Sequence, residues 1–184
     1  MKLETLRLLL RRPHAADLDA YAELFADPEV VRYTGGVTKS RSESELALER
    51  MIRHWDDHGV GLFSIVRKED ERMLGRVGFL IWDTETWLHA MLRPPGGRRE
   101  TEIGWTLARA HWVRGYATEG ATAARDWALH ELGLRRLVSL IQRGNDPSIA
   151  VARKLGETLE REDLPGPFRK PTDLYALTIE APAR

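Results

Sequence analysis

The chain has 184 residues, of which 42% are hydrophobic and 30% charged, and its formal net charge at pH 7 is zero. This length suits one domain with a sizeable core, and the even charge balance argues against a dedicated nucleic-acid binder, which normally carries a basic excess. The absence of cysteine excludes disulfides, thiolate metal sites and cysteine nucleophiles.

The sequence predicts neither secretion nor a membrane partner. Residues 1–4 lead into alternating charged and apolar residues and lack the apolar core of a signal peptide. No stretch approaches the roughly 18 uncharged apolar residues that a membrane span needs. We therefore expect a cytoplasmic protein.

The N-terminal third predicts a strand followed by two helices. Residues 4–12 alternate, with Leu8 and Leu10 on one face and Arg7 and Arg11 on the other, which is typical of a strand. We expect a helix that Pro13 opens and that residues 27–28 end. A second helix should run from about Ser42 to His58, with Gly59 as its stop.

The middle of the chain predicts three strands around a long loop. Two strands at about 60–67 and 73–82 are joined by the charged turn 68–71. The proline and glycine residues at 94–97 predict a long exposed loop over 83–99. A strand at 100–108 follows.

The last third predicts a strand–helix alternation. A helix from about residue 114 to Leu132, with Gly133 as C-cap, precedes a strand at 135–142. A short helix over 146–156 and a strand from Asp173 to Glu180 complete the chain. We expect one α/β (α+β) domain over 4–180, with a mixed sheet and helices on both of its faces.

The stretch from Glu102 to Gly120 is the most informative for chemistry. A strand runs into a glycine turn, and the turn opens a helix, whose first backbone N–H groups are free donors at the positive end of the helix dipole. Such a terminus can bind phosphate, and Gly115 allows close approach because it has no Cβ. On spacing alone the signal is weak, since it fits neither phosphate-loop nor dinucleotide patterns and a glycine before a helix is more often a plain turn.

Several short motifs, taken in order, resemble the GNAT superfamily of N-acetyltransferases. They are Glu-Ile-Gly-Trp at 102–105, Trp-Val-Arg-Gly-Tyr-Ala-Thr-Glu-Gly at 112–120, Asn-Asp-Pro-Ser at 145–148 and Lys-Leu-Gly at 154–156. The openings at 6–13 and 27–30 are most similar to the ribosomal-protein N-terminal acetyltransferase (RimJ/RimL-like) branch. The resemblance implies the GNAT fold, with a mostly antiparallel sheet of about six to seven strands, and acetyl-CoA as co-substrate.

The resemblance also implies where acetyl-CoA is held. The family's pyrophosphate loop, Gln/Arg-x-x-Gly-x-Gly/Ala, maps onto residues 112–117, with Trp112 in place of the first Gln/Arg. Glu157 likewise stands where the family usually has Phe, so packing near the last strands should differ. The implied cofactor contacts are Trp105, Thr106, Leu107, Val113, Arg114, Gly115, Tyr116, Ala117, Thr118, Asn145 and Ser148.

The family's reaction, attack of a neutral amine on a thioester, needs a group that accepts a proton. Glu102 lies on the strand that should flank the acetyl group, so we nominate it as general base. The alternative is an exposed strand glutamate paired with an arginine. The developing oxyanion needs a strand N–H freed by a bulge, which by resemblance lies within residues 105–107, most plausibly at Leu107.

The departing thiolate needs a proton as well. No tyrosine occurs between Asn145 and Gly156, so Ser148 takes that catalytic role by resemblance; a helix N-terminal hydroxyl is the equal alternative. Asn145 should contact the pantetheine arm, unless it is only a turn or cap residue.

Other features allow competing interpretations. His54 and His58, beside Asp57, have the spacing of a metal pair but lack a third ligand in any motif, so we expect no metal and histidines at the surface or pocket rim. Some of the six tryptophans, namely Trp55, Trp82, Trp87 and Trp105, could line an acceptor pocket or pack in the core. The loop arginines, Arg93, Arg98 and Arg99, could attract an acidic acceptor or belong to a solvated loop.

The leading functional hypothesis is an enzyme that acetylates a primary amine, either a protein or peptide N-terminus or a small molecule. One alternative is a non-catalytic acyl-CoA-binding module on the same fold, and another is transfer of a longer acyl group such as succinyl. By analogy with relatives, a homodimer is conceivable.

Overall fold

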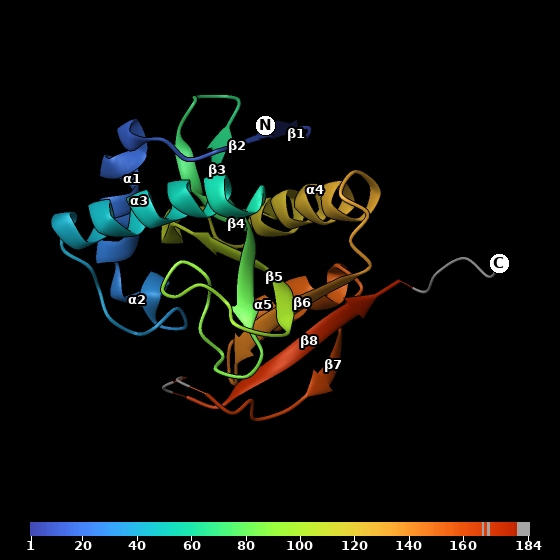
Figure 1. Cartoon of the computed structure of the whole chain (residues 1–184). Helices are drawn as coiled ribbons and strands as arrows, with labels where there is room; N and C mark the ends of the chain where they lie inside the picture. Colours follow the sequence, from blue (N-terminus) through green and yellow to red (C-terminus); the bar gives the residue numbers. More distant parts are fainter. Residues whose placement is uncertain (167, 169, 180–184) are drawn as a thin grey trace.

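The computed structural model describes residues 1–166, 168 and 170–179, and it is built around one eight-stranded sheet (Figure 1). The strands lie in the order β1-β2-β3-β4-β5-β6-β8-β7. Their bounds are β1 Lys2–Glu4, β2 Leu8–Arg11, β3 Leu62–Arg67, β4 Met73–Asp83, β5 Arg99–Leu107, β6 Arg136–Gln142, β7 Thr158–Arg161 and β8 Thr172–Thr178. The α-helices are α1 Leu18–Ala26, α2 Pro28–Val31, α3 Arg41–His58, α4 Tyr116–His130 and α5 Asp146–Lys154. All neighbouring strands are antiparallel except β5 and β6, so the prediction of a mixed, mostly antiparallel sheet is confirmed.

Helices cover both faces of the sheet, as the sequence predicted. On one face, Phe79 of β4 and Ile103 of β5 pack in a core with Trp127 of α4. On the other face, Leu62 of β3 packs with Tyr21 of α1. Because side chains alternate along each strand, Arg76 and Leu80 of β4 and Glu102 and Thr106 of β5 face the α1 and α3 side.

The predicted bounds of α3 and the predicted end of α1 are confirmed, whereas the predicted start of α1 is wrong. Ser40 and Glu43 form the capping box that starts α3, and Gly59, at φ 69°, ends it. Pro13 does not open a helix; a 3-10 turn, Ala15–Asp17, comes first and α1 begins at Leu18. The predicted stop at residues 27–28 also starts a helix, because the Asp27 side chain caps α2.

The sheet has two more short strands than the sequence indicated. The predicted strand over 4–12 is two strands, β1 and β2, because the chain turns at Thr5, whose hydroxyl accepts the Leu8 N–H. Leu6 at that turn is 91% exposed. Strand β7 gave no signal, since it is a short edge strand with all four residues exposed. The predicted end of the last strand at Glu180 lies outside the described residues.

The segment 84–98 is irregular, as predicted, but it is not simply an exposed loop. The Asp83 carboxylate accepts hydrogen bonds from the amides of Glu85, Thr86 and Gly96, which ties both ends of the segment together. Trp87 is only 3% exposed and packs against Val138 of β6. The segment therefore forms a wall over the α1 and α3 side of the sheet.

Helix α4 ends earlier than predicted, at His130 with Glu131 as C-cap, and Gly133 lies two residues farther on with φ 66°. None of the helices in the described part of the chain is both long and apolar enough to cross a bilayer.

The feature that positions the site is the divergence of β5 from β6. The two parallel strands share a single paired position, Glu102 with Val138. Beyond it the strands separate toward the carboxyl end of β5, and a cavity opens between them.

Candidate active site

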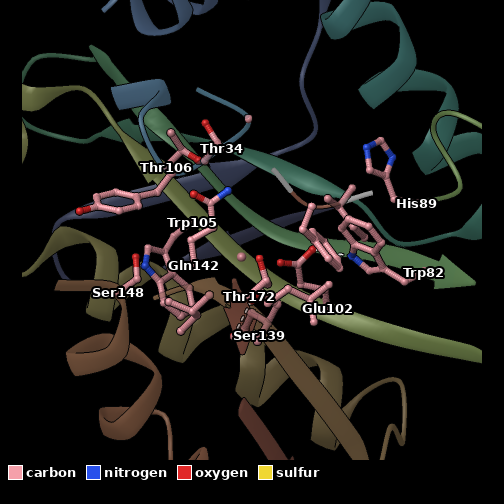
Figure 2. A pocket seen from close by; sticks show the side chains of 18 of the residues that line it. Thr34, Trp82, His89, Glu102, Trp105, Thr106, Ser139, Gln142, Ser148 and Thr172 are labelled. Atoms are coloured by element: carbon pink, nitrogen blue, oxygen red, sulfur yellow. Dashed lines mark hydrogen bonds between the residues drawn. The ribbon is translucent and has the colours of Figure 1, made fainter. Parts of the chain in front are cut away.

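A cavity of about 440 Å3 lies where β5 and β6 separate. Figure 2 shows Glu102 and Trp82 at one end of it and Ser148 at the other. Of the predicted site residues, Glu102, Trp105, Thr106, Asn145 and Ser148 line it. The divergence of two strands thus brings together residues that are more than forty positions apart in sequence.

Glu102 is the most perturbed group in this cavity that the sequence singled out. Its Oε2 accepts a hydrogen bond from the Trp82 indole nitrogen at 2.6 Å. Burial raises the pKa of its carboxyl to about 7, against the opposing effect of that hydrogen bond. The expected alternative, an exposed glutamate paired with an arginine, is wrong: Glu102 is half-buried, and no arginine of the described residues lies within ion-pair distance.

The backbone of β5 offers a free donor at Leu107, the residue that follows Thr106, the last β5 residue lining the cavity. Ala108 N–H bonds to Leu74 O on the β4 side. Successive amides of a strand point to opposite sides, so the Leu107 amide points toward β6, from which β5 has already separated. The pairing with β4 runs from Arg99 to Leu107 without a register shift. Divergence from β6, and not a bulge as expected, therefore frees this N–H.

Asn145 and Ser148 lie at the start of α5, on the cavity wall. Asn145 takes the N-cap position, but its side chain makes no capping hydrogen bond, and Ser148 N–H bonds to the Asn145 carbonyl. Backbone atoms thus complete the turn, and the Asn145 amide stays available to a ligand. Ser148 lies across the cavity from Glu102 (Figure 2).

The loop before α4 presents backbone amides outward. The first hydrogen bond of the helix runs from Glu119 N to Gly115 O, so the amides of Tyr116, Ala117 and Thr118 lack a helical acceptor. Val113 and Gly115 both have left-handed backbones, at φ 57° and 79°. Such alternation forms a concave anion site, and strain at a β-branched residue is a mark of functional loops.

Neighbouring side chains hold this loop in place. Arg7 donates to the Arg114 carbonyl at 3.0 Å and forms an ion pair with Glu119 at 2.6 Å. Trp112 donates its indole N–H to Leu107 O at 2.7 Å, so the residue that departs from the family pattern still braces the loop. Tyr116 is buried in the core, which leaves its backbone as the part that can meet a phosphate.

One buried residue in contact with the cavity-lining Ser139 has a protonation state that the sequence did not reveal. Glu157 is 2% exposed, and burial raises its pKa to about 8, so at neutral pH its carboxyl is mostly protonated. Its Oε1 lies 3.1 Å from Ser139 Oγ, which donates to Ile103 O at 2.8 Å. A neutral Glu157 can therefore donate to Ser139 and complete a chain that holds β5 near β6 at the closed end. The only signal was its replacement of the family's phenylalanine.

Two buried polar atoms on the cavity wall have no protein partner. They are Gln142 Oε1 and His89 Nδ1. Burial lowers the pKa of His89 to about 4, so its ring is neutral. Unsatisfied polar atoms of this kind are costly, and their place on the cavity wall makes them available to a ligand.

The tryptophans and the histidine that allowed competing interpretations divide between the cavity and the core. Trp82, Trp87 and Trp105 line the cavity, whereas Trp55 packs in the core. His54 is 2% exposed and its Nδ1 lies 2.9 Å from Val60 O, so it is a core histidine and not a surface or rim residue. Among the described residues, no group of three or more His, Cys, Asp or Glu could hold a metal.

Comparison with known proteins gives consistent matches over nearly the whole chain. Residues 7–158 match the family described as Acetyltransferase (GNAT) domain. The chain is 30% identical over 169 residues to the uncharacterized N-acetyltransferase p20 of Bacillus licheniformis, covering 91% of this chain and 87% of that protein. It is also 30% identical to the acetyltransferase from Agrobacterium tumefaciens, whose crystal structure superposes with a TM-score of 0.77 over 97% and 95% of the two chains.

A more distant match shares the fold. The RimL ribosomal L7/L12 α-N-protein acetyltransferase, in its complex with coenzyme A, is 18% identical with a TM-score of 0.75 over 97% of this chain and 98% of that chain.

Proposed function

The chain belongs to the GNAT acetyltransferase family, and from that premise we propose that it transfers the acetyl group of acetyl-CoA to a primary amine by direct attack on the thioester. The acceptor is a protein or peptide N-terminus, as for RimL, or a small-molecule amine. The observation that carries the proposal is the carboxyl of Glu102, with a pKa near neutrality, in a cavity lined by residues 102–106 of β5 and next to the free amide of Leu107.

The residues present fit acetyl-CoA, which supplies an activated acyl thioester when bound. The free amides at Tyr116, Ala117 and Thr118, with the loop of Val113, Arg114 and Gly115, suit a diphosphate. Gln142 Oε1 and the Asn145 side chain suit the amide groups of a pantetheine arm, because one is an unpartnered acceptor and the other an unused amide. Trp105 and Thr106 line the cavity between these two places.

Three groups of this chain have separate roles in the reaction. Glu102 takes the proton that the attacking nitrogen loses as its bond to the acetyl carbon forms. The Leu107 amide stabilises negative charge on the acetyl oxygen. As the carbon–sulfur bond breaks, Ser148 gives a proton to the departing sulfur and recovers it from solvent. The products are the N-acetylated amine and free coenzyme A.

Binding and turnover test the proposal separately. Calorimetry should detect binding of acetyl-CoA to the purified protein. A thiol reagent should then report coenzyme A release that depends on an added amine, without background from the protein because the chain has no cysteine. The value of kcat/KM should rise with pH through about 7, as the Glu102 carboxyl loses its proton.

Each negative result of these binding and turnover experiments would lead to a different conclusion. Without binding of acetyl-CoA the proposal is wrong. Binding without turnover on any amine would identify a non-catalytic acyl-CoA-binding module, and faster transfer from succinyl-CoA would identify a longer acyl donor.

A further inference from the structure

The positive side chain of Arg76 has no ion-pair partner among the described residues, although the charge of Glu102 acts on it from farther away. Arg76 of β4 lies on the same face of the sheet as Glu102, because Arg76 pairs with Thr106 and Leu80 pairs with Glu102. Its guanidinium lines the cavity. Among the described residues, no carboxylate oxygen lies within ion-pair distance of it.

The contacts that Arg76 does make are weak and neutral. Its Nε lies 3.5 Å from Thr106 Oγ1, its Nη1 lies 3.5 Å from Met51 Sδ, and its Cζ lies 5.0 Å from the centre of the Phe25 ring. Burial lowers the pKa of the guanidinium, which means that its charged form is poorly solvated. An arginine remains charged in proteins nonetheless, so most of the five N–H donors of Arg76 lack a strong hydrogen-bond acceptor.

A second polar group near Arg76 also lacks a partner. The neutral ring of His89 lines the cavity with an unpartnered Nδ1, and the positive charges of Arg76 and Arg50 help to keep the ring neutral. A bound carboxylate would pair with Arg76, and it can accept a hydrogen bond from His89 in the tautomer that carries its proton on Nδ1. Carboxylate and guanidinium match in geometry, since two parallel N–H···O bonds can form.

The opposite charge lies at the Glu102 end of the cavity. Arg76 and Glu102 are four positions apart along the paired strands, about 13 Å between Cα atoms at ~3.3 Å per residue, and their long side chains shorten that gap. Apolar side chains from Trp82, Leu88 and Leu92 complete the wall. The cavity thus offers a negative end, a positive end and an apolar side.

We infer that the acceptor is a small amine that bears a carboxylate, an amino acid with an apolar side chain, whose carboxylate binds Arg76 while its amine faces Glu102. This inference rests on the proposed acetyl transfer and narrows its acceptor. Arg76 is then the residue that sets specificity. The loop arginines Arg93, Arg98 and Arg99 do not take this part, because their side chains are exposed and outside the cavity lining.

Matched acceptors test the inference on the wild-type enzyme. L-Phenylalanine, L-phenylalaninamide and phenethylamine share an apolar body, and only the first carries a carboxylate. We expect kcat/KM for L-phenylalanine to exceed that for either neutral analogue by at least about tenfold, as a buried charge-assisted pair allows. The pair L-leucine and 3-methylbutylamine should behave in the same way.

Substitutions at Arg76 test whether this residue causes the preference for amines that bear a carboxylate. Arg76→Met should remove the preference by raising KM for the amino acids, while KM for acetyl-CoA stays unchanged; Arg76→Lys should retain part of the preference. Arg53→Met, on the exposed side of α3, is the matched control and should keep it. Thermal melting checks that each variant is folded.

The outcomes separate this inference from the proposed function. If phenethylamine or the amide is acetylated as well as L-phenylalanine, the inference is wrong although the transfer reaction stands. An equal drop in kcat for all amines in Arg76→Met would also overturn it, because Arg76 would then act on the thioester. If no amine is acetylated and acetyl-CoA does not bind, the proposed function itself has failed.

Discussion

The loop that precedes α4 follows directly after β5, which lines the cavity, yet the loop and the cavity offer a ligand different kinds of groups. The loop presents backbone amides whose direction depends on the left-handed conformations of Val113 and Gly115. The cavity presents the side chains of Glu102 and Arg76, and Glu157 lies against the cavity-lining Ser139; the shifted pKa values of all three come from burial. We therefore expect the loop to tolerate most side-chain changes, and the cavity to tolerate very few.

The largest effect is expected at Glu102. In Glu102→Gln the proton acceptor is lost while shape and the partner Trp82 remain, so kcat should fall by ~10²- to 10⁴-fold. The dissociation constant of acetyl-CoA should stay within a factor of about two, because the phosphate contacts lie elsewhere. Glu69→Gln in the exposed turn before β4 is the control. A Glu102→Gln enzyme with undiminished kcat would show that another group accepts the proton.

The next effect concerns stability and comes from Glu157. Its pKa is raised from 4.5 to about 8 in the folded protein, so the folded state holds this proton more tightly than the unfolded state does. The contribution of Glu157 to stability is therefore present below pH 4.5 and is lost as pH rises to about 8. Glu157→Gln keeps a donor for Ser139 without a charge, and should stabilise the fold at pH 9 by on the order of 2–4 kcal/mol relative to wild type.

Denaturant unfolding at pH 5 and pH 9 measures this difference. The gain of Glu157→Gln should be small at pH 5 and large at pH 9. An equal gain at both values would mean that Glu157 is not a buried neutral acid.

The smallest effect is expected on acetyl-CoA binding by the loop before α4, and it tests most directly whether backbone amides or side chains hold the diphosphate. Gly115→Val places a β-branched side chain at φ 79°, a strain of about 1–2 kcal/mol, and should weaken acetyl-CoA binding about tenfold without changing kcat at saturation. Arg114→Ala alters only a side chain beside the same amides and should cost about threefold or less. Calorimetry on both variants decides the matter: if Arg114→Ala proves the more damaging, side chains and not amides hold the diphosphate.

Local patterns predicted the elements whose ends have their own chemistry. Gly59 was predicted as the stop of α3 and ends that helix, and the strands predicted at 60–67, 73–82 and 100–108 correspond to β3, β4 and β5. Strand β7 could not be predicted in this way, because its four exposed residues carry no burial pattern and only pairing with β8 makes it a strand. Pro13 misled for a related reason: the carboxylate of Asp17 is held by Arg11 and Ser64 from two strands, so long-range contacts decide where the first helix starts.

The sequence by itself determined the family and the strand–turn–helix unit, and it singled out Glu102, Gly115 and Ser148 as candidate site residues, because each of these inferences depends on residue types at short, fixed spacing. Only the tertiary structure decided that β5 separates from β6, that Glu157 is buried as a neutral acid, and that Arg76 faces a cavity with no ion-pair partner in the described part of the chain. Burial and charge pairing depend on which distant segments come together, and a carboxyl or guanidinium has no shifted pKa until the surrounding protein removes its water.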